Sequence, residues 1–425
     1  MDSAGAPRCQ AAIIPDQAAI HAVPQSRAQH QDDQPPRYMI DLSLPPLQRY
    51  QHVARDFKPH LATLPTLFDE VVGGLHPNIS IRTLRRLASI FLRRLYGKEE
   101  TQEIRGICNV TGLDMHLLIA FNTFLDLFMG CTSGGARVKD RGEDAKMLHF
   151  RTLDWGMDPL RKIIVQLDYV NEAGGEPIAT SITYVGFVGC LTGVRNALSI
   201  SLNFRPNHIA SSRAGNLRFY LHQILVLLGF RPSISAVLRE YLIPSSTTKD
   251  GKTSENSPQD LAAIEASLPG RPSTAAYLIF SDGDRTVTME KDNCTAVVKS
   301  SPEFIVATNH DVSAEKSNPQ ARANLEPTPS QTLRSTGMDE LVEESTTRKR
   351  CIMQLHQGAA KRAKKSNKAR GGGKAKPVAV TTHELFTAVD GYPITNKETH
   401  YSVVMDPKAG KVVRIRRFLE PTDVL

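Results

Sequence analysis

The sequence predicts an α+β fold in which one structural domain occupies most of the 425 residues. Apolar segments of helical length come first in the chain, and short runs rich in Val, Ile, Thr and Tyr follow them. Hydrophobic residues make up 40% of the chain, so it can bury a large core. These observations by themselves support α+β and no finer architecture.

Three segments have the pattern of helices. Residues 81–96 carry apolar side chains at helical spacing with arginines on the opposite face, and Ser80 stands where an N-cap is expected. Residues 115–129 are apolar almost throughout, which fits either a buried helix or a core strand. Residues 216–228 have the composition of a second, more apolar helix.

Nine short segments have the pattern of strands, and turn residues separate many of them. Glycines within 171–175 and 406–410 suit hairpin turns, because glycine adopts positive φ readily. The predicted strands are 147–153, 162–170, 178–185, 197–203, 275–281, 286–291, 295–299, 400–405 and 411–418.

The dipeptide Gly130-Cys131 lies where the apolar segment 115–129 gives way to the predicted strands. A cut between the two residues would leave Cys131 with a thiol and a free α-amine, so one residue would supply nucleophile and general base. The ordinary pKa of an α-amine is about 8, which is close to working pH. The alternative is that Cys131 is a small buried apolar residue, as internal cysteines commonly are.

A series of short motifs runs along the chain in the order found in one known family. They are 38–46, Glu103-Ile104-Arg105-Gly106-Ile107, Thr111-Gly112, Phe121-Asn122, Cys131-Thr132-Ser133, Tyr184-Val185-Gly186, Leu191-Thr192-Gly193, Ser201-Leu202-Asn203, Ala307-Thr308-Asn309-His310-Asp311 and Tyr401-Ser402-Val403-Val404-Met405. In these motifs the chain resembles the acid ceramidase and N-acylethanolamine acid amidase family of N-terminal-nucleophile hydrolases, which are related to choloylglycine hydrolases.

The resemblance implies a four-layer αββα sandwich that is cut between Gly130 and Cys131. Residues 38–130 would form the α-chain, and residues 131–425 would form the β-chain that starts at the nucleophile. We expect residues 1–37 to be a disordered tail. Two insertions are rich in polar residues or proline, so we also expect them to be disordered or loosely ordered; they are 244–272 and 312–377.

The same resemblance assigns catalytic roles around the cut. Cys131 would attack first the Gly130 carbonyl and later a substrate amide. Arg151 would place a positive charge beside the thiolate, and Asp154 would hold the new α-amine. Residues three apart on a strand face opposite sides, so both can serve one site only if the strand ends near Gly156. The alternative for Arg151 and Asp154 is a surface charge pair at a strand end.

Asn309 and an arginine complete the implied catalytic set. The side-chain amide of Asn309 would donate to the oxyanion of the tetrahedral intermediate, although a turn residue is the simpler alternative. Arg348 matches the family's later arginine, and Arg350 is an alternative placement. Because this arginine falls inside the second insertion, either residues 340–357 pack as a helix or the match is wrong.

The implied substrate is the linear amide of an N-acyl lipid, such as ceramide or an N-acylethanolamine. The matching positions for substrate binding are Trp155, Tyr184 and Asn203. Phe204 stands where relatives carry an acidic residue, which leaves the selectivity for the polar head open. Two alternatives remain: a cleavage-incompetent relative that binds lipid or acts as a scaffold, and an amidase of the choloylglycine or penicillin type.

The cysteines and the hydropathy pattern suggest the compartment. The six cysteines include no Cys-x-x-Cys pair, so we expect neither a zinc site nor a disulfide framework, and no cofactor is implied. Residues 1–37 lack the pattern of a secretory signal, and no apolar run is long enough to span a bilayer. We therefore expect a cytoplasmic protein with reduced thiols.

The formal net charge of +8 is concentrated in one segment. Residues 348–376 contain no acidic side chain, and removing their positive charges leaves the remainder of the chain at −3. The composition of this segment is typical of a solvated linker. The alternatives are a nuclear-localisation signal and a contact with an anionic membrane. The segment lacks aromatic side chains for base stacking, so we expect no nucleic-acid partner. Its eleven cations are Arg348, Lys349, Arg350, Lys361, Arg362, Lys364, Lys365, Lys368, Arg370, Lys374 and Lys376.

Overall fold

The computed structural model of the chain describes residues 33–75, 80–124, 130–209, 212–243, 246–249, 252–255, 258–315, 325–327, 338–369 and 377–422. Most of the predicted tail 1–37 therefore lies outside the described residues. So do residues 125–129, the end of the apolar segment before Cys131.

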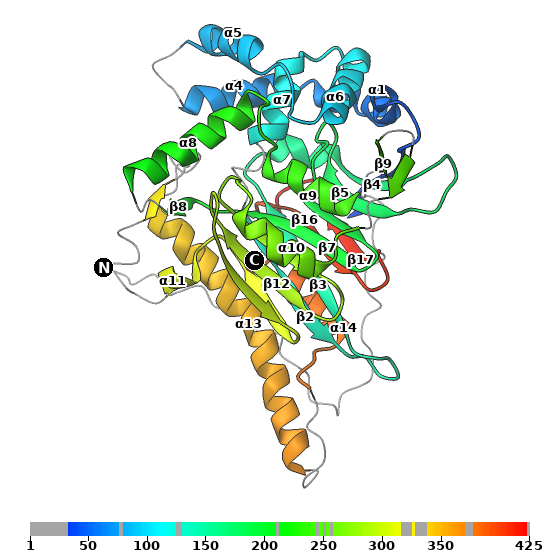
Figure 1. Cartoon of the computed structure of the whole chain (residues 1–425). Coiled ribbons are helices and arrows are strands. Elements are labelled where there is room, and N and C mark those ends of the chain that lie inside the picture. Colours follow the sequence, from blue (N-terminus) through cyan, green and yellow to red (C-terminus); the bar gives the residue numbers. More distant parts are fainter. Residues whose placement is uncertain are drawn as a thin grey trace.

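Two β-sheets form the centre of the molecule (Figure 1). The larger sheet has the order β1-β4-β5-β6-β7-β11-β12-β13. All its neighbouring strands are antiparallel except β1 and β4, which run parallel. Its strands are β1 (Arg37–Asp41), β4 (Ile164–Val170), β5 (Ala179–Tyr184), β6 (Thr192–Arg195), β7 (Leu198–Phe204), β11 (Ala276–Ser281), β12 (Thr286–Lys291) and β13 (Ala296–Ser301).

The smaller sheet is antiparallel throughout, with the order β14-β2-β3-β16-β17. Strand β2 starts at Gly130, so the predicted cleavage site is the beginning of a central strand. The second residue of β2 is Cys131, the predicted nucleophile, and it pairs with Leu153 of β3. The strands are β2 (Gly130–Val138), β3 (Lys146–Asp154), β14 (Phe304–Ala307), β16 (Thr399–Asp406) and β17 (Lys411–Arg417).

The two sheets pack face to face, with β7, β11 and β12 against β2 and β3. Gly135 in β2 permits this approach, because a Cβ there would lie 1.9 Å from Oγ1 of Thr286 on β12. Helix α9 (Ile234–Leu242) covers β6 and β7, while α13 (Met338–Ala369) and α14 (Thr382–Asp390) cover the smaller sheet. The layers are therefore helix, sheet, sheet and helix, as predicted.

The residues before Gly130 form a helical region that packs on the larger sheet (Figure 1). This region also supplies β1, so the parts on either side of the predicted cut share one sheet and one hydrophobic core. Its helices are α1 (Pro46–Arg49), α2 (Gln51–Asp56), α3 (Lys58–Leu61), α4 (Leu64–Leu75), α5 (Ile81–Phe91), α6 (Lys98–Thr111) and α7 (Met115–Phe124).

The predicted elements agree closely with the observed ones. The apolar segment is a helix, α7, in the residues that are described, and Ser80 caps α5 by accepting from the Thr83 amide. The helix predicted over 216–228 is α8 (Arg213–Leu227). The strand predicted over 162–170 starts two residues later, because the 3₁₀ helix η3 (Asp158–Ile163) precedes it. Among the described helices, none has the length and apolarity needed to cross a bilayer.

The insertions contain more regular structure than expected. Within 244–272 lie the hairpin β9 (Ser246–Lys249) and β10 (Lys252–Glu255), helix α10 (Leu261–Ser267) and the 3₁₀ helix η4 (Leu268–Gly270). Leu261, Ile264 and Leu268 are buried in the main core, so disorder was wrongly predicted for 261–270.

The second insertion, 312–377, likewise contains α11 (Val312–Glu315), β15 (Leu325–Pro327), which pairs with β8 (Asn207–Ile209), and the long helix α13. Ile352 and Ala359 of α13 are buried against the smaller sheet. Disorder was therefore wrongly predicted for 338–369, and the alternative of a helix over 340–357 is confirmed.

Candidate active site

Cys131 is the second residue of β2 and has no exposed surface. In the antiparallel register of β2 and β3, Gly130 pairs with Asp154, and Cys131 pairs with Leu153. Paired residues share a face of the sheet, and positions two apart share it too. The Cys131 side chain therefore lies with Arg151 between the two sheets, and Asp154 lies on the side covered by α13.

Arg151 contacts the thiol directly. Its Nη2 donates to the Cys131 Sγ at 3.3 Å, and its Nη1 donates to the Leu191 carbonyl. The guanidinium lies over the ring of Tyr401, 6.0 Å from the centroid. Burial raises the pKa of Cys131, and the positive charge of Arg151 opposes that rise. In the uncleaved chain the thiol is therefore neutral and needs a base before it can attack.

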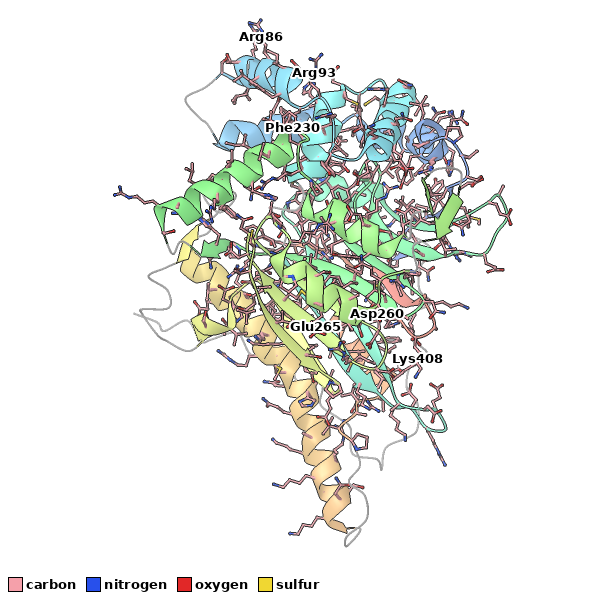
Figure 2. The ribbon with its side chains drawn as sticks, viewed as in Figure 1. Arg86, Arg93, Phe230, Asp260, Glu265 and Lys408 are labelled. Carbon is pink, nitrogen blue, oxygen red and sulfur yellow. The ribbon has the colours of Figure 1, made fainter. Side chains whose placement is uncertain are left out.

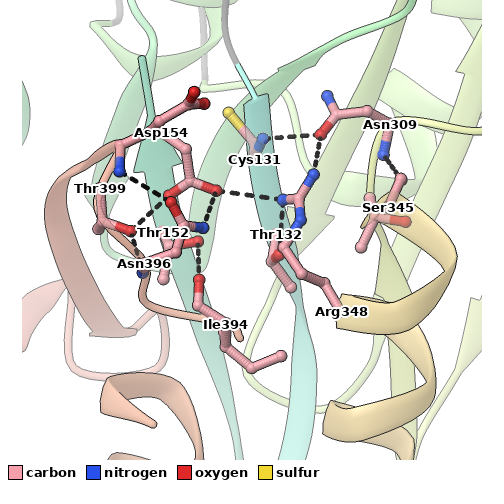
Figure 3. Close-up of polar contacts among 12 residues, drawn as sticks. Cys131, Thr132, Thr152, Asp154, Asn309, Ser345, Arg348, Ile394, Asn396 and Thr399 are labelled. Carbon is pink, nitrogen blue, oxygen red and sulfur yellow. Dashed lines mark hydrogen bonds and ion pairs between the residues drawn. The ribbon is translucent and has the colours of Figure 1, made fainter. Parts of the chain in front are cut away.

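Arg348 reaches the other side of Cys131 from α13 (Figure 3). It donates to Thr132 Oγ1 at 3.1 Å, to Asp154 Oδ2 at 3.1 Å and to Asn309 Oδ1 at 2.9 Å. Arg350, the alternative placement, is exposed on the same helix. The structure therefore brings Arg348, and not Arg350, to the predicted nucleophile.

Asn309 lies against the backbone nitrogen of Cys131. Its Oδ1 accepts from this N–H at 2.8 Å, its Nδ2 donates to the Phe204 carbonyl at 2.8 Å, and its own N–H donates to Ser345 Oγ at 2.7 Å. The nitrogen that a cut would turn into an α-amine is thus held by Asn309. We predicted Asp154 for that contact and an oxyanion role for Asn309, and both roles remain predictions for the cleaved form.

Asp154 is the last residue of β3, so the predicted strand end at this position is confirmed. Its carboxylate accepts from Thr399 Oγ1 at 2.8 Å and from Asn396 Nδ2 at 3.5 Å, besides Arg348. Burial raises the pKa of Asp154 to about 6, and the Arg348 charge opposes the rise. This carboxyl therefore titrates near neutrality, within the pH range in which general acids and bases work.

The raised pKa of Asp154 predicts a pH dependence of stability. A carboxyl whose pKa is about 6 when folded and 3.8 when unfolded favours the folded state below pH 4, and this contribution is lost as pH rises through 6. The difference corresponds to about 3 kcal/mol at most. In a Cys131→Ala background, the free energy of unfolding should fall between about pH 4 and pH 6 by more than it falls in the same protein with Asp154→Asn.

Urea denaturation of both proteins across this range would measure the difference. His149, whose pKa burial lowers to about 3, contributes equally to both proteins and cancels in the comparison. Parallel stability curves would show that Asp154 keeps an ordinary pKa.

The three predicted substrate-binding residues lie in two places. Trp155 and Tyr184 form an aromatic cluster with His400, and Tyr184 Oη and His400 Nδ1 are 2.8 Å apart. Asn203 lies on β7 beside the smaller sheet, where its Oδ1 accepts from Ser133 Oγ at 2.7 Å. All three side chains are buried in the uncleaved chain.

The sequence analysis missed several residues that shape this site. Ser345, one turn before Arg348 on α13, accepts from the Asn309 N–H and contacts His310 Nδ1 at 2.8 Å. Thr399 and Asn396 hold Asp154. The i, i+3 spacing of Ser345 and Arg348 was the available signal, since it places both on one helix face.

A cavity of about 1480 Å³ lies between β1, the β4–β5 turn and β17, and none of the residues that contact Cys131 lines it. This cavity is therefore separate from the candidate site. Because Cys131 itself has no exposed surface, the uncleaved arrangement has no room for an acyl chain at the thiol.

Comparisons with known proteins point to the same family as the motifs. A family model described as the beta subunit of N-acylethanolamine-hydrolyzing acid amidase matches residues 33–96. The acid ceramidase of Mus musculus is 25% identical over 300 residues, which span 65% of this chain and 70% of that protein. The acid ceramidase of Rattus norvegicus is 29% identical over 188 residues, which span 40% of this chain and 45% of that protein.

One similar solved structure is the Caenorhabditis elegans N-acylethanolamine-hydrolyzing acid amidase ortholog, with 19% identity and a TM-score of 0.43. The alignment covers 65% of this chain and 93% of that one. These sequence relationships support the acid ceramidase and N-acylethanolamine acid amidase family, which the ordered motifs also indicate.

Proposed function

We propose that this protein is a self-cleaving cysteine amidohydrolase that splits the linear amide of N-acyl lipids into a fatty acid and an amine. One observation carries the proposal. Cys131 lies between two arginines. Arg151 donates a hydrogen bond to its thiol, and Asn309 accepts one from its backbone N–H. Arg348 in turn donates to Asn309 and to Asp154. A cut before Cys131 would therefore place a thiol and an α-amine beside the charged groups of Arg151, Arg348 and Asp154.

Self-cleavage would begin when the Cys131 Sγ attacks the carbonyl carbon of Gly130. The bond from that carbon to the Cys131 nitrogen breaks, the nitrogen takes up the thiol proton, and a thioester joins Gly130 to Sγ. Water then hydrolyses the thioester, which leaves a Gly130 carboxylate, a free thiol and a free α-amine. Arg151 favours the ionised sulfur in the first step, because its guanidinium already donates to Sγ.

The same groups would then act on a lipid amide. The α-amine takes the thiol proton, Sγ attacks the amide carbon, and the proton passes to the departing amine nitrogen. Water releases the fatty acid from the thioester and restores the thiol. Asn309 is the proposed donor to the oxyanion, a role that requires its amide to turn once Cys131 carries an amine.

The test is intact mass followed by product analysis. The purified 46.8 kDa chain is incubated from mildly acidic to neutral pH and then given ceramide, an N-acylethanolamine or a bile-salt amide. A fragment that begins at Cys131, together with release of fatty acid from one of the lipids, would support the proposal. A folded chain that stays whole at every pH would favour the lipid-binding or scaffold alternative, and activity on the bile-salt amide alone would favour the choloylglycine type.

The two neighbouring arginines of α13 provide a matched prediction. Arg348→Gln should slow self-cleavage about 100-fold or more, because Asp154 would lose its buried cationic partner and Asn309 would lose one donor. Arg350→Gln removes the same charge from an exposed position and should leave the rate unchanged. Mass spectrometry of timed samples gives both rates, and equal slowing by the two variants would contradict the role of Arg348.

A further inference from the structure

Helix α13 has two parts with different surroundings. Its first half packs on the smaller sheet, burying Ser345, Arg348 and Ile352. Its last turns extend beyond the body of the molecule (Figure 1). The helix that carries Arg348 into the candidate site therefore continues as an extension beyond the body of the molecule.

The extending part of α13 is strongly basic. Lys361, Lys364, Lys365 and Lys368 are exposed, and no acidic residue occurs on the helix after Glu344. Arg362 forms an ion pair with Glu384 of α14 at 2.8 Å, which ties the base of the extension to the body. Outside the segment 348–376 the net charge is −3, so a polyanion would be attracted to this end of the molecule rather than to its whole surface.

We propose that these four lysines form a docking surface for an anionic lipid bilayer. This inference rests on the proposed function, since N-acyl lipids reside in membranes. Clusters of four to eight basic residues on a helix suit anionic headgroups, and the contributions of the individual lysines add up.

The composition of the extension favours a membrane over a nucleic acid. Residues 357–369 contain no aromatic side chain on which a base could stack. The only arginine in this stretch, Arg362, already binds a carboxylate, so the planar group suited to base recognition is engaged. Lysines act as point charges, which is sufficient for a diffuse anionic surface.

The experiment measures binding of the full-length chain to vesicles, independently of hydrolysis. Vesicles of phosphatidylcholine are compared with vesicles that also contain phosphatidylserine, by co-sedimentation at low and physiological salt. The chain should bind only the anionic vesicles, and less at higher salt. Replacing the four lysines by glutamine should weaken binding about 100-fold or more, whereas hydrolysis of a detergent-dispersed N-acyl lipid should be unchanged.

A matched control lies at the opposite end of the molecule. Arg86 and Arg93 are at the end that carries α5 (Figure 2). Arg82 on α5 and Arg218 on α8 are two further exposed arginines outside α13. Replacing these four arginines by glutamine removes the same charge and should leave binding intact. Loss of binding in this control with retention in the lysine variant would overturn the proposal. So would failure to bind anionic vesicles, or tighter lysine-dependent binding to a duplex oligonucleotide. Loss of hydrolysis with vesicle binding intact would count against the proposed function alone.

Discussion

Replacing Cys131 by alanine is expected to leave a single chain that neither splits nor hydrolyses an amide. The thiol is the only group at this position able to form the thioester on which both reactions depend. Folding should survive, because the substitution removes one buried sulfur from a site whose backbone is held in β2 between two strands. Intact mass and fatty-acid release, measured beside wild type, test the expectation.

Cys190 provides the matched control for this variant. It is also a buried cysteine of the same core, and its substitution by alanine costs packing in a similar way. Cys190→Ala should cleave itself and turn over substrate at rates near those of wild type. If Cys131→Ala retained a split before residue 131, or if both variants lost activity together, Cys131 would not be the nucleophile.

The second large effect is expected from Glu103, which joins the two parts of the chain. Its carboxylate has no exposed surface and accepts from Arg239 at 2.5 and 2.7 Å and from Arg49 at 3.2 Å. Glu103 and Arg49 precede the predicted cut, and Arg239 follows it. Glu103→Ala should destabilise the uncleaved protein by about 3 to 5 kcal/mol, because it leaves the buried Arg239 without its carboxylate partner.

The neighbouring Glu99 separates this effect from a simple loss of charge. It contacts the same Arg49 at 3.3 Å, but its side chain is 67% exposed. Glu99→Ala should change the free energy of unfolding by at most about 1 kcal/mol. Urea denaturation in a Cys131→Ala background gives both values. Similar values for the two variants would show that Arg239 finds another partner. After cleavage, the Glu103 variant should also release its first fragment more readily in size-exclusion chromatography.

The α13 region shows how far composition misleads about order. Its sequence is polar and highly charged, which predicted a disordered or loosely ordered segment over 312–377. Only a few apolar residues, Ile352 and Ala359 among them, hold the helix on the smaller sheet. A sparse apolar face suffices because β2, β3 and β14 already present a complementary surface, and that surface exists only after the sheet has formed.

Arg151 and Asp154 illustrate the same limit at the site. Their spacing predicted that the strand must end near Gly156 for both to serve one site, and β3 ends at Asp154. The two side chains nevertheless lie on opposite faces of β3 and flank Cys131 from either side, which follows from the register with β2. Spacing along one strand cannot supply that register.

Residue patterns were sufficient for the α+β class, because alternation and apolar periodicity are local properties of a chain. The ordered motifs added the sandwich through the family that they resemble, and they predicted Cys131 as the nucleophile. The contacts of Arg348, Ser345 and Thr399 with Asn309 and Asp154 were decided by tertiary structure. They join residues between 36 and 245 positions apart, and only the packing of α13 and β16 around β2 and β3 sets those distances.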